Sequence, residues 1–302
     1  MNQALGREAP AQAHLCDRVV PVGAWPPSPA DQAEALSALE QGEVVVLPNL
    51  RFDLSHGEEA LLDGSVSDGR SKNISFDPAG GRLRGAQGDG ERLILIRRMM
   101  ERFSGWSAAV IGALLPGYGE ALQLGKTSFR PCEIETRPTS PRKDDKRLHV
   151  DAFPSQPVQG RRILRLFANI DPERPRVWNV GEPFEPFATR FLPGAGPRIP
   201  GSGWLMELLQ LTKGRRTAYD HAMLRLHDLA KEDSVYQETA IRRRVEFPPG
   251  SSWIVFTDAT LHAALEGRHA LEQTFLLPVE TMADEAMSPL RTLERLTGRA
   301  LV

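Results

Sequence analysis

A histidine and an aspartate separated by one residue constrain this chain more than any other feature. Residues 148–155 have the sequence LHVDAFPS, which places His149 and Asp151 two positions apart. Side chains of an extended strand alternate between its two faces, so these two side chains are expected to project together. An imidazole and a carboxylate placed in this way are two of the three ligands in the two-histidine, one-carboxylate site for ferrous iron. Because His-x-Asp also occurs by chance, the prediction requires a second histidine from another strand.

His262 is the predicted second histidine, and the sequence before it supports this choice. Residues 245–247 alternate between apolar and polar, Pro-Pro-Gly at 248–250 predicts a turn, and residues 253–256 predict a buried strand. A strand, a turn, a second strand and then a histidine is typical of a double-stranded β-helix, where His-x-Asp comes earlier in the chain.

These two features together predict the fold class and a metal site. We expect a mainly β protein with flanking helices and a double-stranded β-helix (jelly-roll, cupin-like) core. The predicted metal ligands are His149, Asp151 and His262. The alternative is that both histidines are ordinary polar residues near the ends of strands.

Length and composition limit the number of domains, the class of protein and the compartment that can be expected. The 302 residues are expected to form a single domain over 31–302, preceded by an Ala-, Pro- and Gly-rich extension over 1–30. A net charge of −2 argues against a protein dominated by nucleic-acid binding. Two cysteines, Cys16 and Cys132, make neither a disulfide framework nor a thiolate metal site, so a reducing cytoplasm is expected. The longest apolar run, 108–115, is far shorter than the ~20 residues of a membrane span.

Cap residues and apolar spacing predict the remaining elements. The predicted helices cover residues 28–41, 89–115, 204–211, 218–231 and 288–298. The other predicted strands cover 43–47, 122–130, 160–170 and 270–277, while the glycine-rich run 80–85 is expected to be loop. The apolar helix at 204–211, with the basic residues that follow it, would either dock on an anionic lipid surface or pack as a lid, and the second role is favoured.

Two histidines on the predicted helix 218–231 are not expected to bind metal. His221 and His227 lie six residues apart, so they do not share a helix face closely.

Basic residues surround the predicted metal site. A loop leading into the His-x-Asp segment would either bind an anion at the mouth of the site or simply be solvated; its basic residues are Arg142, Lys143, Lys146 and Arg147. On the strand after the motif, Arg162 and Arg165 point to opposite faces. A guanidinium buried inside the sheet needs an anion, either a dicarboxylate cosubstrate or an internal carboxylate.

Four stretches of the chain resemble the 3-deoxy-D-manno-oct-2-ulosonic acid (Kdo) hydroxylase family; they are residues 148–155, 160–170, 175–182 and 262–278. The resemblance extends from about residue 30 to the C-terminus. It implies an iron(II)- and 2-oxoglutarate-dependent dioxygenase that hydroxylates carbon 3 of a Kdo sugar on Kdo-lipid A with molecular oxygen, with ascorbate as a candidate further cofactor. It also implies an enzyme that is either cytoplasmic or associated peripherally with the cytoplasmic face of the inner membrane.

The resemblance also bears on the cosubstrate site. Many members of the superfamily hold the far carboxylate of 2-oxoglutarate with an arginine on the strand after the distal histidine, but this chain has Glu272 there. Others use a basic residue two positions after a glycine on the strand that follows His-x-Asp, and Gly160 and Arg162 match that pattern. The predicted cosubstrate residues are, in order of preference, Arg162, Arg165 and Arg268, with Thr274 beside them. The basic loop residues would then bind the sugar carboxylate and the lipid phosphates.

Two other functions remain open from the sequence. The nearer is a 2-oxoglutarate oxygenase of the same fold acting on a protein or a small metabolite. The farther is a non-catalytic jelly-roll binding protein that keeps a vestigial metal site.

Overall fold

The computed structural model describes residues 19–134, 140–196 and 212–302. Cys16, most of the predicted N-terminal extension and the predicted helix at 204–211 lie outside these ranges. The described residues form two β-sheets. The larger has eight strands in the order β1-β2-β9-β6-β11-β5-β3-β4, and the smaller has three in the order β10-β7-β8.

The central strands of the large sheet bury their whole length. Strand β6 is buried at all eight positions and pairs with β9 on one side and β11 on the other. In chain order, the strands of the large sheet are β1 Val19–Pro21, β2 Val44–Leu47, β3 Ile74–Asp77, β4 Arg82–Arg84, β5 Gln123–Arg130, β6 Arg162–Asn169, β9 Ser252–Phe256 and β11 Ala270–Leu277. Those of the small sheet are β7 Arg176–Gly181, β8 Arg242–Phe247 and β10 His262–Glu266.

An aromatic core fills the space between the two sheets. The Trp253 ring stacks on Phe247 with centroids 4.0 Å apart and on Phe167 at 5.1 Å. Trp178, from the small sheet, meets Phe167 edge to face at 4.9 Å. Side chains in register with these rings therefore point into the interior. This arrangement confirms the predicted double-stranded β-helix.

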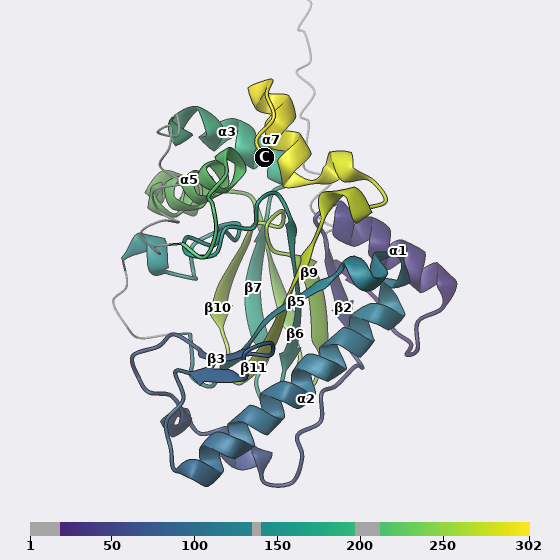
Figure 1. Cartoon of the computed structure of the whole chain (residues 1–302), viewed down its shortest axis with the longest axis vertical. Coiled ribbons are helices and arrows are strands. Elements are labelled where there is room, and N and C mark those ends of the chain that lie inside the picture. The colour runs from purple at the N-terminus through teal and green to yellow at the C-terminus, as the bar shows by residue number, and fades with distance from the viewer. Residues whose placement is uncertain (1–18, 135–139, 197–211) are drawn as a thin grey trace, which may run out of the picture.

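Helices cover the outer face of the large sheet and one end of the strands. Figure 1 shows α1 and α2 along the side of the large sheet and α3, α5 and α7 grouped above one end of it. Their bounds are α1 Pro29–Glu40, α2 Gly90–Leu114, α3 Phe184–Phe191, α5 Ala218–Glu232, α6 Ser234–Thr239 and α7 Pro289–Thr297.

The predicted starts of three helices are confirmed by their caps. Ser28, Asp89 and Ser288 each accept a hydrogen bond from a backbone N–H in the first turn of α1, α2 and α7. Within the described ranges, no helix combines the length and the apolar character that crossing a bilayer would require.

Three sequence-based expectations differ from the structure. Strand β1 falls inside the predicted extension and pairs in parallel with β2, so that part of the extension belongs to the sheet. The glycine-rich run 80–85 contains β4, which pairs with β3. The His-x-Asp segment is not a regular strand, because His149 forms only an isolated bridge with His262.

Candidate metal centre

Backbone hydrogen bonds bring the three predicted ligands together. His149 and His262 each donate a backbone N–H to the other's carbonyl, at 3.1 and 2.9 Å. The Asp151 N–H donates to the Thr257 carbonyl, just after β9, at 2.8 Å. One isolated bridge and one further bond are enough to make the side chains of His149 and Asp151 project together. Ligand atoms of the three residues all lie within 4.8 Å of one another.

The two imidazoles are oriented for metal binding. Nδ1 of His149 donates to the Arg147 carbonyl at 2.7 Å, and Nδ1 of His262 donates to the Thr260 carbonyl at 2.9 Å. A carbonyl oxygen can only accept, so each Nδ1 carries the proton and each Nε2 is free as a ligand. The His262 ring also stacks on Trp178, with centroids 5.1 Å apart.

Electrostatics favour the protonation states that bind a metal. Burial lowers the pKa of His149 well below its usual value, and that of His262 also falls. Burial alone would raise the pKa of Asp151, but the positive charge of Arg165 opposes it and helps to hold that pKa below its usual range. Neutral imidazoles and an ionised carboxylate are the forms that coordinate divalent ions. Two imidazoles and one carboxylate are also the donor set of non-haem iron(II) oxygenases, so these residues fit that ion.

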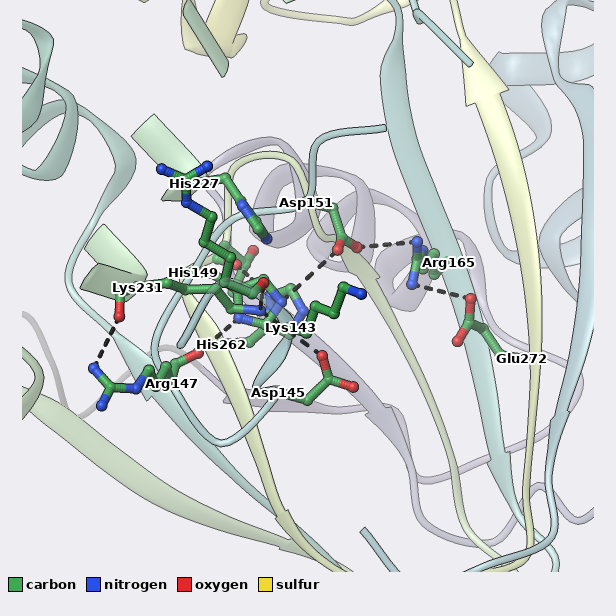
Figure 2. Close-up of polar contacts among 12 residues, drawn as sticks. Lys143, Asp145, Arg147, His149, Asp151, Arg165, His227, Lys231, His262 and Glu272 are labelled. Carbon is green, nitrogen blue, oxygen red and sulfur yellow. Dashed lines mark hydrogen bonds and ion pairs between the residues drawn. The ribbon is translucent and has the colours of Figure 1, made fainter. Parts of the chain in front are cut away.

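A chain of alternating charges leads inward from the metal ligands. Arg165 pairs with Asp151 at 3.2 Å and with Glu272 at 3.0 Å, as Figure 2 shows. Arg130, from β5, pairs with the other oxygen of Glu272 at 2.7 Å. Glu272 therefore pairs with two arginines delivered by the neighbouring strands. Both hold its pKa below the usual value although burial opposes them.

The structure separates the four predicted cosubstrate residues. Arg165 and Thr274 are register partners on β6 and β11, and both face the interior. Arg162 faces the other side of β6, where it is fully buried and pairs with Asp258 at 2.8 Å. Arg268 lies between β10 and β11 and pairs with Asp171 at 2.9 Å. The geometry therefore argues against the prediction that Arg162 binds the cosubstrate, because its anion is an internal carboxylate.

Arg176 is an interior residue that the sequence reasoning did not single out. It is the register partner of Phe247, and its side chain is buried at 3% exposure. Its guanidinium donates to the Gly267 carbonyl at 2.8 Å but forms no ion pair with a described carboxylate. Burial and the nearby charge of Arg130 lower its pKa to about 9. A buried cation without a carboxylate partner indicates room for an external anion.

Other polar atoms on inward-facing residues also lack partners. The indole N–H of Trp178 and Nε of Arg165 have no hydrogen-bond partner among the described residues. Both residues lie on inward-facing positions of their strands. Alternation along 176–180 could have placed Arg176 beside Trp178 on one face, but this stretch is not among the predicted strands.

Two arginines of the basic loop already have partners within the protein. Arg142 pairs with Glu232 of α5 at 2.5 Å, and Arg147 donates to the Lys231 carbonyl at 2.8 Å. Lys143, in a short 3₁₀ turn, is exposed, and its amine has no partner among the described residues. Lys146 is half-buried. Lys143 is therefore the residue of this loop that is best placed to meet an external anion.

Comparisons with known proteins agree with this geometry. The model of a family described as 3-deoxy-D-manno-oct-2-ulosonic acid (Kdo) hydroxylase matches residues 23–300. A crystal structure of the Kdo hydroxylase KdoO, a non-haem Fe(II) α-ketoglutarate-dependent dioxygenase, in complex with cobalt(II), is 44% identical with a TM-score of 0.91. The match covers 94% of this chain and 97% of that one. The same enzyme in complex with α-ketoglutarate and Fe(III) is 43% identical, with a TM-score of 0.90 and the same coverage. No curated protein matches the chain.

Proposed function

The chain belongs to the Kdo hydroxylase family, and from this premise we propose that it hydroxylates carbon 3 of a Kdo sugar carried on Kdo-lipid A. It is a non-haem iron(II)- and 2-oxoglutarate-dependent dioxygenase. The observation that carries the proposal is the convergence of His149, Asp151 and His262 beside an interior with spare hydrogen-bond donors. Family membership favours this function over an oxygenase for proteins or small metabolites and over a non-catalytic binding protein.

The metal ligands have a defined task in this reaction. His149, Asp151 and His262 would hold iron(II), which supplies the oxidising chemistry once 2-oxoglutarate and oxygen are present. One oxygen atom enters the sugar, the other enters succinate, and the carboxyl group next to the keto carbon leaves as carbon dioxide. The protein fixes the imidazoles through carbonyl acceptors and buries both of them, which limits access of competing water.

Arg176 is the residue that we assign to the far carboxylate of 2-oxoglutarate. Arg165 already balances Asp151 and Glu272, so its charge is used within the protein. Arg176 is equally buried but has only a carbonyl partner, and its guanidinium offers the fork geometry that a carboxylate fits. Arg165 and Thr274 would line the same space, and Arg165 would orient Asp151.

An Arg176→Gln variant should bind 2-oxoglutarate about ten- to a hundredfold more weakly, because a hydrogen bond to a charged group contributes about 1.5–3 kcal/mol. Steady-state kinetics with varied 2-oxoglutarate should show this as a raised KM. Arg174→Gln is the matched control, because Arg174 is an exposed neighbour that pairs with Glu133 at 3.6 Å. An unchanged KM in Arg176→Gln, with a raised KM in Arg165→Gln, would move the role to Arg165.

Charge at the mouth supports an acidic, lipid-linked sugar as the substrate. Lys143, in the loop that leads into the His-x-Asp segment, presents an exposed ammonium group. A sugar carboxylate or a lipid phosphate is the kind of group that such a lysine attracts. Lys146, Arg142 and Arg147 would contribute positive charge around it. A lipid substrate would place the enzyme in the cytoplasm, in peripheral contact with the cytoplasmic face of the inner membrane.

The substrate assignment is tested by mass spectrometry of the lipid. Purified protein is incubated with Kdo-lipid A, iron(II), 2-oxoglutarate, oxygen and ascorbate, and the Kdo fragment is analysed. We expect that fragment to gain the mass of one oxygen atom, and we expect no gain when 2-oxoglutarate is omitted. An unmodified Kdo fragment alongside a modified small metabolite or protein would contradict the assignment.

A further inference from the structure

A third histidine lies beside the metal ligands although it is remote from them in sequence. His227 is on α5, and its ring meets that of His149 edge to face, with centroids 5.4 Å apart. Figure 2 shows its side chain extending from the helix toward the cluster of metal ligands. The earlier inference that His227 is not a ligand agrees with the geometry, since the group of converging ligand atoms consists of His149, Asp151 and His262.

An aspartate fixes the orientation of this imidazole. Nδ1 of His227 donates to Oδ1 of Asp228 at 2.9 Å, and Asp228 in turn lies 3.7 Å from Nη1 of Arg142. Burial would raise the pKa of Asp228, but the bond to His227 and the charges around it hold that pKa below its usual value. An ionised carboxylate can only accept, so Nδ1 of His227 carries a proton. Arg142, which is predicted to bind substrate, also contacts Asp228.

The other ring nitrogen is left for an external partner. No described residue forms a hydrogen bond with Nε2 of His227, and the side chain is 15% exposed. With the proton on Nδ1, Nε2 of a neutral imidazole is an acceptor. It therefore suits a hydroxyl group better than a carboxylate. Because its ring contacts a metal ligand, a molecule bound at Nε2 would lie beside the metal centre.

We propose that His227 is a substrate-binding residue that accepts a hydrogen bond at Nε2 from a hydroxyl group of the sugar and so holds the reacting carbon beside the metal centre. This inference rests on the proposed Kdo substrate, which is rich in hydroxyl groups. Asp228 and Arg142 act through His227 as positioning residues. Losing the contact should leave iron and 2-oxoglutarate binding intact, because neither depends on His227, but should misplace the sugar.

Two substitutions separate the two ring nitrogens. In His227→Asn the side-chain amide occupies the position of Nδ1, so it can still reach Asp228 but offers nothing at Nε2. In His227→Gln the longer side chain places its amide near the position of Nε2. We expect a KM for Kdo-lipid A that is about three- to tenfold higher in His227→Asn and closer to wild type in His227→Gln.

The deciding readout is the ratio of hydroxylated Kdo to succinate, measured together with the visible absorption of the anaerobic iron(II)–2-oxoglutarate complex. We expect His227→Asn to keep that absorption while its ratio falls well below the wild-type value, and His227→Gln to restore much of the ratio. Three results would overturn the role of His227. The first is a wild-type ratio and a wild-type KM in His227→Asn, and the second is an equal fall of the ratio in His227→Asn and His227→Gln. The third is loss of the visible absorption in His227→Asn. The proposed function would still stand in these cases, because wild-type protein in the same assay would hydroxylate Kdo. No hydroxylated Kdo from wild type would overturn both.

Discussion

In the Asp151→Ala variant, the rate of 2-oxoglutarate-dependent hydroxylation is expected to fall at least about a hundredfold. Substituting a residue that only hydrogen-bonds to a metal ligand commonly lowers metal affinity or activity by about ten- to a hundredfold. Asp151 is itself a proposed ligand, so its loss should cost at least as much. Its removal also takes the carboxylate from between His149 and Arg165, which lie 3.9 and 3.2 Å from its oxygens. The measurement is succinate and product formation at saturating iron(II) and 2-oxoglutarate.

Asp144→Ala is the control for this experiment. Asp144 comes from the same loop, and its carboxylate lies 3.8 Å from Arg147 without belonging to the converging ligand group. We expect this variant to keep most of its activity. Thermal unfolding of both variants shows that the proteins compared are folded. Turnover of Asp151→Ala near the wild-type rate would remove Asp151 from the ligand set.

Replacing Arg162 by alanine should destabilise the fold by about 3–5 kcal/mol, because it leaves a buried carboxylate without its counter-ion. Asp258 is fully buried, its bond to Arg162 is 2.8 Å long, and the guanidinium also lies over the Phe256 ring, 3.9 Å from its centroid. Urea unfolding monitored by tryptophan fluorescence measures the loss. We expect the KM for 2-oxoglutarate to stay near that of wild type, since Arg162 faces away from the metal centre.

Two comparisons test the cause of that instability. Arg82→Ala removes an exposed arginine that lies 3.9 Å from Asp77, and it should cost less than about 1 kcal/mol. Replacing Arg162 by Met and Asp258 by Leu together should recover much of the lost stability, because neither charge remains buried. A double variant as unstable as Arg162→Ala would show that packing, not the orphaned charge, causes the loss.

The pH dependence of the Arg162→Ala variant follows from Asp258. Burial raises the pKa of this carboxyl even with Arg162 beside it, and removing the arginine takes away a charge that lowers it. A carboxyl whose pKa is higher in the folded than in the unfolded protein favours folding at low pH. That contribution is lost as the pH rises through the folded pKa. The deficit should therefore be larger at about pH 8 than at about pH 5, and a deficit independent of pH would contradict this account.

Local patterns in the sequence were sufficient to predict that His149, Asp151 and His262 converge, and their role as metal ligands stays a prediction. Alternation placed His149 and Asp151 together even though the segment forms only an isolated bridge, because three backbone hydrogen bonds hold it in place. The turn at Pro248–Gly250 and the strand before His262 predicted where the distal histidine arrives. Cap residues predicted the starts of the helices that cover the sheet.

Alternation did not reveal which face of a strand is the interior. Every residue of β6 is buried, so the pattern that separated Arg162 from Arg165 could not say which of them faces the metal centre. Arg162 looked suitable because its position matched a family pattern, yet its partner Asp258 is nearly a hundred residues away and comes close only in the fold. Arg176 was missed because no strand was predicted over residues 176–181.

Contacts between elements that are far apart in the sequence also could not be predicted from local sequence patterns. The spacing of His221 and His227 argued against a metal-binding pair on one helix, and the group of converging ligand atoms in the described residues contains neither of them. It could not show that α5 packs over the His-x-Asp segment and brings His227 to His149. The same limit applies to the basic loop, where Arg142 is held by α5 through Glu232 and Asp228.

Succinate release that depends on Kdo-lipid A, measured with and without iron(II), tests the central claim most directly. We predict that succinate forms rapidly only when the lipid and iron(II) are both present, in equal amount to hydroxylated Kdo. We also predict that His262→Ala, which removes a ligand from the other segment of the centre, abolishes both products. Lipid-dependent succinate that persists after iron is removed by a chelator, or in the His262→Ala variant, would contradict an iron centre built from His149, Asp151 and His262.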